Sequence, residues 1–171
     1  DITNSNLLNN TFKSNRLADN PVDRIYSGAI YAGYLDNSNI TGTFINNTAG
    51  FGGALCLDGI KNGKISANFI NNTANNATNG FGGAIALKNA DSYGAKLIGC
   101  NFTNNTALSS NGGAVYIPAV NGMDVIGCNF TMNKVNSDSA YGGAIYIKDS
   151  SKAIKIEKSV FDNNSAPTGD S

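Results

Sequence analysis

The sequence repeats the tripeptide Gly-Gly-Ala at a constant interval, at residues 52–54, 82–84, 112–114 and 142–144. A degenerate copy, Ser27-Gly28-Ala29, lies slightly closer to the first of them than the full copies lie to one another. A period of about 30 residues indicates a solenoid, a propeller or an array of stacked units. Each repeat is therefore expected to be one unit that buries its apolar face against its neighbours.

A second motif, Phe-x-x-Asn, alternates with the first along the chain. It begins at Phe12, Phe44, Phe69, Phe102, Phe130 and Phe161. The Asn of each copy is Asn15, Asn47, Asn72, Asn105, Asn133 or Asn164. Between the two motifs lies a further apolar stretch, such as residues 95–98 and 123–126. Each repeat therefore offers three short strands separated by turns.

These patterns predict an all-β fold, a right-handed single-stranded parallel β-helix of about five coils with three short strands per coil. Helix signals are weak, because Gly or Asn interrupts every few positions and no apolar stripe recurs at helical spacing. We expect residues 1–171 to form a single domain of this kind. The repeats run close to both ends of the sequence, so we expect the chain to be a segment of a larger repeat-containing surface protein.

Alternation along the strand that follows Gly-Gly-Ala predicts which side chains face the interior. Two aliphatic columns are predicted to point inward: Leu55, Ile85, Val115 and Ile145, and Leu57, Leu87, Ile117 and Ile147. The more variable column between them is predicted to point outward: Tyr31, Cys56, Ala86, Tyr116 and Tyr146. In the later strands the predicted inward residues are Leu97, Val125 and Ile156, together with Phe69, Phe102, Phe130 and Phe161.

The Asn residues of the second motif are predicted to form a structural ladder along the axis of the coils. A buried turn leaves backbone N–H and C=O groups that need partners. An Asn amide offers two donors and an acceptor, and stacked Asn side chains can also bond one another. Replacement of one of them by Ala is therefore expected to destabilise the fold.

The alternating Gly-Gly-Ala-Ile and Phe-x-x-Asn motifs resemble those of the chlamydial polymorphic outer-membrane proteins, over nearly the whole chain from Phe12 to Asn164. Asn is the commonest residue, at 28 of 171, and the Asn-Asn-Thr runs are also similar to adhesin-like surface proteins of methanogenic archaea. The resemblance implies a right-handed β-helix, an extracellular location at the cell surface, and a role in adhesion or display. Its implied partners are other cells or surface polysaccharide and protein ligands.

Charge and hydropathy exclude two classes of partner. Lys and Arg number 12 and Asp and Glu number 12, so the formal net charge is zero and no basic footprint for nucleic acid exists. No run of 18 apolar residues occurs, so direct membrane insertion of this segment is not expected. The acidic residues are dispersed and His is absent, so we expect no enzyme, no catalytic residues, no cofactor and no metal site.

Aromatic residues precede the Gly pair in four of five copies, at Tyr26, Phe51, Phe81 and Tyr141. If these side chains point outward, they form a stripe on which sugar rings can stack. If they point inward or flank the strand, they cover the turn. Tyr116 and Tyr146 form a second candidate pair for exposure on the surface. These six residues are the candidate binding residues.

Three functions remain open from the sequence: an adhesin-like protein that binds cells or glycans, a structural stalk, and a polysaccharide-degrading β-helix enzyme.

Cys100 and Cys128 occupy equivalent places in successive repeats. Stacking is expected to bring their Cα atoms within the range of a disulfide, but we expect two buried, reduced thiols. Strand edges at the two ends of the stack need covering. The isolated chain is therefore expected to self-associate end to end.

Overall fold

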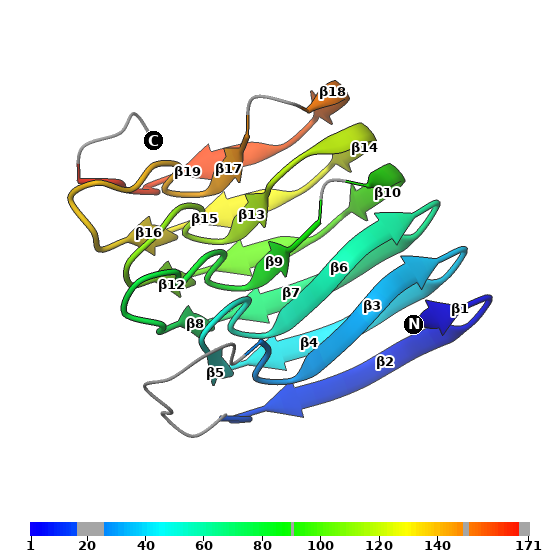
Figure 1. Cartoon of the computed structure of the whole chain (residues 1–171), viewed down its shortest axis with the longest axis horizontal. Coiled ribbons are helices and arrows are strands. Elements are labelled where there is room, and N and C mark those ends of the chain that lie inside the picture. The colour runs from blue at the N-terminus through cyan, green and yellow to red at the C-terminus, as the bar shows by residue number, and fades with distance from the viewer. Residues whose placement is uncertain (17–25, 90, 149–150, 168–171) are drawn as a thin grey trace.

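The computed structural model of the chain describes residues 1–16, 26–89, 91–148 and 151–167. All regular elements in these residues are β-strands, and every strand pair among them is parallel. The strands stack as about five turns of a β-solenoid, with residues 1–16 at one end of the stack and residues 151–167 at the other (Figure 1). The predicted all-β parallel architecture is confirmed.

The strands fall into four columns along the axis. The first column follows Gly-Gly-Ala or its degenerate copy: β3 (Ile30–Asp36), β6 (Leu55–Lys61), β9 (Ile85–Leu87), β13 (Val115–Ile117) and β17 (Ile145–Ile147). The second column is β1 (Ile2–Thr3), β10 (Ser92–Ile98), β14 (Val120–Ile126) and β18 (Lys152–Glu157), and it continues the line of the long strands β3 and β6. The third contains the Phe of the second motif: β2 (Asn6–Lys13), β4 (Asn39–Ile45), β7 (Lys64–Ile70), β11 (Asn101–Thr103), β15 (Asn129–Thr131) and β19 (Val160–Asp162).

A fourth column forms a separate four-stranded sheet that the sequence analysis did not predict. Its members have two residues each: β5 (Thr48–Ala49), β8 (Thr73–Ala74), β12 (Thr106–Ala107) and β16 (Lys134–Val135). Each follows directly on a ladder Asn, which turns the chain into the new sheet. So short a segment carries too little periodicity to be recognised as a strand in a sequence.

The core is a column of like side chains in register. Phe44, Phe69, Phe102 and Phe130 are fully buried and occupy paired positions in successive coils. Ring centroids of successive Phe residues in this column lie 4.7 to 4.9 Å apart with interplanar angles of 4° to 12°. This spacing equals the separation of neighbouring strands, so the coil repeat itself sets the stacking distance.

The turns depend on residues with positive φ at fixed places in each coil. The first Gly of each Gly-Gly-Ala pair has φ between 48° and 79°, a conformation that Gly adopts without the steric cost of a Cβ. The residue before each ladder Asn also has positive φ, between 52° and 56°: Ser14, Asn46, Asn71, Asn104, Met132 and Asn163. The second Gly serves close approach instead, because a Cβ on Gly83 would overlap the carbonyl oxygen of Gly113 and the backbone nitrogen of Thr106.

The side chains predicted to face inward are buried in the inner coils but are partly or largely exposed in the last coil. Leu55, Leu57, Leu97 and their equivalents in the inner coils are buried. In the last coil Ile145 and Ile147 are only partly buried, while Ile156 is 44 % and Phe161 is 48 % exposed. They have the predicted orientation, but no further coil of the described chain covers them.

The outward prediction needs a correction at two positions. Cys56 and Ala86 are buried, although both lie outside the interior cluster to which Leu55 and Leu57 belong. Tyr116, the register partner of Ala86, has the ring of Phe81 packed on it. The aromatic side chains before the Gly pairs therefore form an outer layer over this column, which hides its small members from water.

Candidate functional site

One continuous row of aromatic rings runs along the outer face of the first column of strands. Its members in axial order are Tyr31, Tyr26, Phe51, Phe81, Tyr116 and Tyr146. Successive ring centroids lie 4.3 to 5.9 Å apart. The row forms because each ring precedes a Gly pair or occupies the outward position after it, and the coils stack in register. Two candidate sets that are separate in the sequence are thus one surface.

Five of the six candidate binding residues belong to this row, and Tyr31 is its sixth member. Tyr141 is 52 % exposed and makes no ring contact with this row in the described residues. Its backbone N–H donates to Asn111 Oδ1 at 2.7 Å. Tyr31 was assigned outward but not proposed as a binding residue, and it stacks on Tyr26 at 4.7 Å. Tyr31 shares the outward position of Tyr116 in the repeat, and this equivalence in the sequence could have identified it as a member of the row.

The row borders a recess of about 250 Å³ in the outer surface. Its lining residues are Tyr26, Phe51, Phe81, Leu87, Lys88, Asn89 and Tyr116. Four of these side chains are partly buried: Tyr26, Phe51, Phe81 and Tyr116. Asn89 is exposed. The recess therefore combines aromatic walls with amine and amide groups, the composition of many small-ligand sites.

Lys88 links three coils at the edge of this recess. Its Nζ lies 2.9 Å from Asp58 Oδ1 and 4.0 Å from the ring centroid of Tyr26, and it donates to Tyr31 Oη at 3.2 Å. Desolvation acts to lower the pKa of Lys88, but the bonds to Asp58 and Tyr31 outweigh it, so the pKa is raised. Lys88 is a cation at physiological pH, and Asp58 balances its charge locally.

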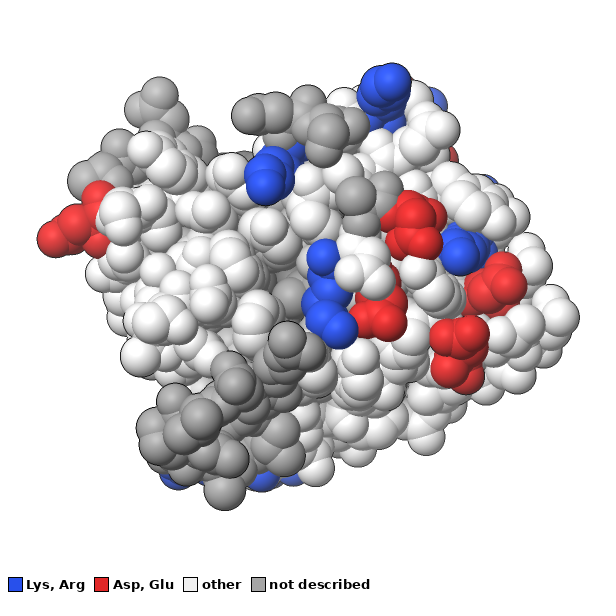
Figure 2. Space-filling model, viewed as in Figure 1, with Lys and Arg blue, Asp and Glu red and all other residues white. Residues whose placement is uncertain are grey.

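Lys61, in β6, forms a second ion pair. Lys61 Nζ lies 3.8 Å from Asp91 Oδ2 and 3.6 Å from the ring centroid of Tyr34. The Tyr34 hydroxyl donates to Asp91 at 2.5 Å, and this bond raises the pKa of Tyr34. Basic and acidic side chains lie beside one another on the face in Figure 2. The surroundings of the aromatic row therefore favour neither an anionic nor a cationic ligand.

The ladder Asn residues lie along a different edge of the coil and are bonded throughout. Asn72 is typical: its backbone N–H and its Nδ2 both donate to Asn105 Oδ1 at 3.0 Å, and its Nδ2 also donates to the Phe44 carbonyl at 3.0 Å. The same pattern recurs at Asn47, Asn105 and Asn133, all fully buried. Both donors and the acceptor of each amide are used, so the column is structural.

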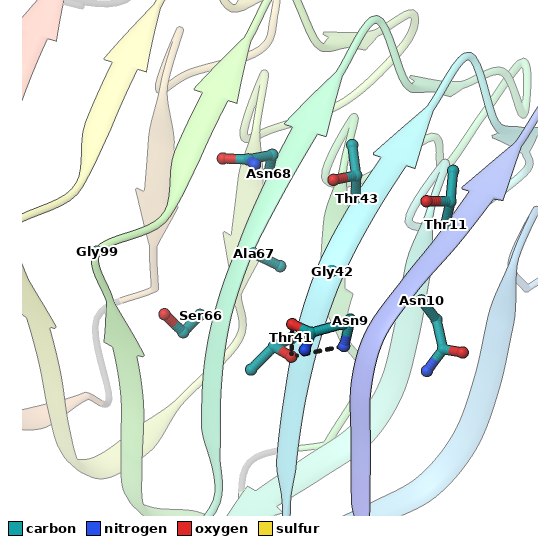
Figure 3. A pocket seen from close by; sticks show the side chains of 10 residues that line it. All are labelled: Asn9, Asn10, Thr11, Thr41, Gly42, Thr43, Ser66, Ala67, Asn68 and Gly99. Atoms are coloured by element: carbon teal, nitrogen blue, oxygen red, sulfur yellow. Dashed lines mark hydrogen bonds between the residues drawn. The ribbon is translucent and has the colours of Figure 1, made fainter.

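A second hollow, of about 360 Å³, lies over the third column of strands (Figure 3). Hydroxyl and amide groups line it: Asn9, Asn10, Thr11, Thr41, Gly42, Thr43, Ser66, Ala67, Asn68 and Gly99. It arises because β4 and β7 have one residue fewer at this bend than the coils on either side. The signal is visible in the sequence, as Phe44 follows Ile40 more closely than Phe102 follows Leu97.

The three Cys residues are free and buried, which was expected of Cys100 and Cys128 but not of Cys56, predicted to point outward. The backbone N–H of Cys100 donates to Cys128 Sγ at 3.4 Å, and its thiol bonds the Ile65 carbonyl at 3.2 Å. The interaction with Cys128 and burial both raise the pKa of Cys100. Within the described ranges no three His, Cys, Asp or Glu residues gather as a metal site, and no helix there is long and apolar enough to cross a membrane.

Comparison with known proteins matches the chain to one family of repeats. The model of the Chlamydia polymorphic membrane protein repeat matches residues 41–58 and 99–118. No curated protein and no solved structure matches the chain. Each matched segment contains the sequence from a Phe-x-x-Asn motif to the strand after Gly-Gly-Ala, the two features that build the Asn ladder and the aromatic row. Residues 41–58 and 99–118 are therefore similar to repeats of the Chlamydia polymorphic membrane protein type, and the chain folds as a parallel β-solenoid.

Proposed function

We propose that this chain is part of an adhesin-like protein of the cell surface and that it binds neutral carbohydrate at its aromatic row. The observation that carries the proposal is the recess between the rings of Tyr26, Phe51, Phe81 and Tyr116. The repeat family supports the surface location, since the family is one of membrane proteins. A rigid solenoid that extends from a surface presents such a row at a distance from it.

The chemistry of the recess suits the face of a pyranose ring. The C–H groups on one face of a sugar pack on aromatic rings, while its hydroxyl groups need hydrogen-bond partners. Lys88 and Asn89 supply donors at the rim of the recess. Because Asp58 lies 2.9 Å from Lys88 Nζ and balances its charge, neutral sugars are favoured over uronic or sialic acids.

The site is proposed to hold a sugar without cutting it. Glycoside hydrolysis uses two carboxyl groups that flank the scissile bond. Asp58 is the acidic residue that contacts the row, through Tyr31, and its carboxylate is engaged by Lys88. Among the described residues, no carboxylate lines the recess itself.

A stalk without a ligand is the second candidate, and one observation favours it. The same rings that border the recess cover Cys56 and Ala86, so they stabilise the coil whether or not a sugar binds. A row that serves only this purpose would give a rigid spacer between other domains.

Retention of the purified chain on a panel of immobilised neutral and acidic glycans, and on whole cells, separates these functions. The native chain is expected to be retained by neutral glycans, and Phe81→Ala is expected to lower retention at least tenfold. Tyr93→Ala is the matched control, because Tyr93 is 44 % exposed and lies outside the row. Thermal melts of each variant confirm that the fold is kept.

Three results would contradict the proposal. Absence of retention for the native chain would favour the stalk. Equal retention of Phe81→Ala and Tyr93→Ala would remove the aromatic row as the site. Sugar released into the same wells would show that the chain is an enzyme.

A further inference from the structure

The polar hollow over the third column of strands lies away from the aromatic row, which follows the first column (Figure 3). Its volume of about 360 Å³ falls within the range of small-ligand sites, about 300–1,000 Å³. Among the described residues, no charged side chain lines it. Its lining side chains end almost entirely in hydroxyl and amide groups.

We propose that this hollow is a second binding site, which takes one unit of a neutral saccharide through its hydroxyl groups. The inference goes beyond the proposed function, because it involves no residue of the aromatic row and does not depend on that row. It rests on three observations. The backbone keeps the hollow open, hydrogen bonds hold two amides in place, and several polar groups in the hollow have no internal partner.

The backbone forms the hollow because two neighbouring coils are one residue shorter at this bend than the coils on either side. Residues 7–10 of β2 pair with residues 40–42 of β4. On the other side, residues 97–101 pair with residues 65–68 of β7. Each longer coil has a residue of positive φ at the bend that lines the hollow: Asn9 and Gly99. The two shorter coils therefore form a floor between two walls.

Glycine at position 99 leaves the space above this floor empty. Gly99 is exposed, and a Cβ there would have one neighbour within 4 Å, the hydroxyl oxygen of Ser66 at 3.9 Å. A longer side chain at this position would extend beside Ser66 and occupy the hollow. Gly127 is the equivalent residue of the next coil, has the same φ of 62° and lies outside the hollow. The two glycines thus offer a matched pair for substitution.

Hydrogen bonds fix an amide on each side of the hollow. The backbone N–H of Asn9 donates to Thr41 Oγ1 at 2.9 Å, and the Thr41 hydroxyl donates to Asn9 Oδ1 at 3.4 Å (Figure 3). Asn68 Oδ1 accepts from Asn101 Nδ2 at 2.8 Å, and Asn101 Oδ1 accepts from Asn129 Nδ2 at 2.9 Å. Both amides are held before a ligand arrives, which lowers the entropy that binding costs.

Four polar groups that line the hollow make no hydrogen bond with the described residues. They are the Nδ2 of Asn68 and the hydroxyl groups of Thr11, Thr43 and Ser66. Thr11, Thr43 and Asn68 are register partners on three successive strands, which lie about 4.8 Å apart. The hollow therefore presents a regular array of groups, of which the hydroxyls both donate and accept and the amide nitrogen donates.

A saccharide has the matching chemistry, because each of its hydroxyl groups also both donates and accepts. An apolar ligand would gain little, since Ala67 is the one side chain without a polar atom in the described lining. An ion would lose its hydration without meeting an opposite charge. Hydrogen bonds that replace those to water contribute little each. The expected affinity is therefore in the millimolar range, too weak to retain the chain on a glycan surface without the aromatic row.

NMR titration of the ¹⁵N-labelled chain tests the site. The probes are the methyl glycosides of glucose, galactose, mannose and N-acetylglucosamine, and the signals followed are the side-chain amides of Asn9, Asn10 and Asn68. The Phe81→Ala chain is titrated beside the native one, because this change removes a wall of the aromatic recess. At least one glycoside is expected to shift the three amides saturably in both chains.

The same titrations separate this site from the aromatic row. Glycosides that shift signals of the row but leave the three amides unchanged would refute the hollow and leave the proposed function intact. Amide shifts that vanish in the Phe81→Ala chain would also refute it, since the hollow would then not bind independently.

Two pairs of variants test the geometry, with thermal melts to confirm that each variant folds. Gly99→Asn is expected to abolish the amide shifts and Gly127→Asn to leave them unchanged, because Asn tolerates positive φ at both positions. Thr43→Val removes one hydroxyl and is expected to weaken binding about fivefold, the effect of one lost hydrogen bond. Thr103→Val is its control, since Thr103 is equally half-buried and lies outside the hollow. Equal effects within either pair would overturn the proposal.

Discussion

At the scale of single residues, this fold depends on side chains that form hydrogen bonds with backbone groups at the turns of each coil. Asn105, for example, accepts the backbone N–H of Asn72 and donates to the carbonyl of Phe69, both in the preceding coil. Buried side-chain polar atoms all have partners among the described residues. The Asn column was predicted from spacing and amide chemistry alone, because only a side chain with both donors and an acceptor serves a stacked turn.

Replacement of a buried ladder Asn is expected to be far more costly than replacement of an exposed one. Asn105→Ala leaves the Asn72 backbone N–H and the Phe69 carbonyl without partners in a fully buried place. At about 1–3 kcal/mol for each of these two orphaned groups, the loss should be about 2–6 kcal/mol. Asn101→Ala, on an exposed Asn ladder, is expected to cost under about 1 kcal/mol. Equal denaturation midpoints for the two variants would contradict the structural role.

Burial of Cys56, in the outward column, predicts how the stability of the fold depends on pH. Burial raises the pKa of Cys56 to about 12, whereas an unfolded thiol titrates at about 8.5. Between these values the unfolded chain loses a proton that the folded chain keeps, so stability is complete below about pH 8.5 and falls as pH rises. Cys56→Ala is expected to flatten this fall, and Ala is the natural residue at the paired position 86. Parallel melting profiles of the two proteins from about pH 8 to 11 would show that Cys56 is not covered.

At the scale of elements, each strand is defined by the corners that bound it. The Gly-Gly-Ala and Phe-x-x-Asn strands were predictable, because their apolar alternation recurs in every repeat. The short strands β5, β8, β12 and β16 were not, since they carry no alternation of their own. The outward column was assigned correctly in direction but not in exposure, because the cover over Cys56 comes from rings that belong to neighbouring turns.

The two kinds of Gly in the corners are expected to respond differently to Ala. A Cβ on Gly113 would overlap the Gly143 carbonyl oxygen and lie 2.7 Å from the backbone nitrogen of Lys134, both rigid groups. Gly127 has φ of 62° but nothing within 4 Å of the added Cβ. Gly113→Ala should therefore cost about 3 kcal/mol of unfolding free energy and Gly127→Ala about 1 kcal/mol. Urea titrations compare them, and a larger loss for Gly127→Ala would contradict the packing described.

At the scale of the whole molecule, the nearly constant length of the repeat places equivalent residues of successive coils beside one another. The constant period was enough to predict stacked coils, since no coil can bury its apolar face alone. It did not predict that Tyr116 and Tyr146 continue the row of Tyr26, Phe51 and Phe81, because that depends on how far each ring reaches toward the next coil. Nor did it predict the recess beside Lys88, which arises from side chains of several coils together.

Saturation-transfer NMR between aromatic protons of the chain and a panel of neutral saccharides tests the central claim most directly. The chain contains no Trp, and its rings are seven Tyr and eight Phe. For the native chain, saturation of ring protons is expected to pass to the C–H face of a bound sugar, and Phe51→Ala and Phe81→Ala are each expected to abolish the transfer. Undiminished transfer in these variants, or none from any saccharide to the native chain, would contradict binding at the aromatic row.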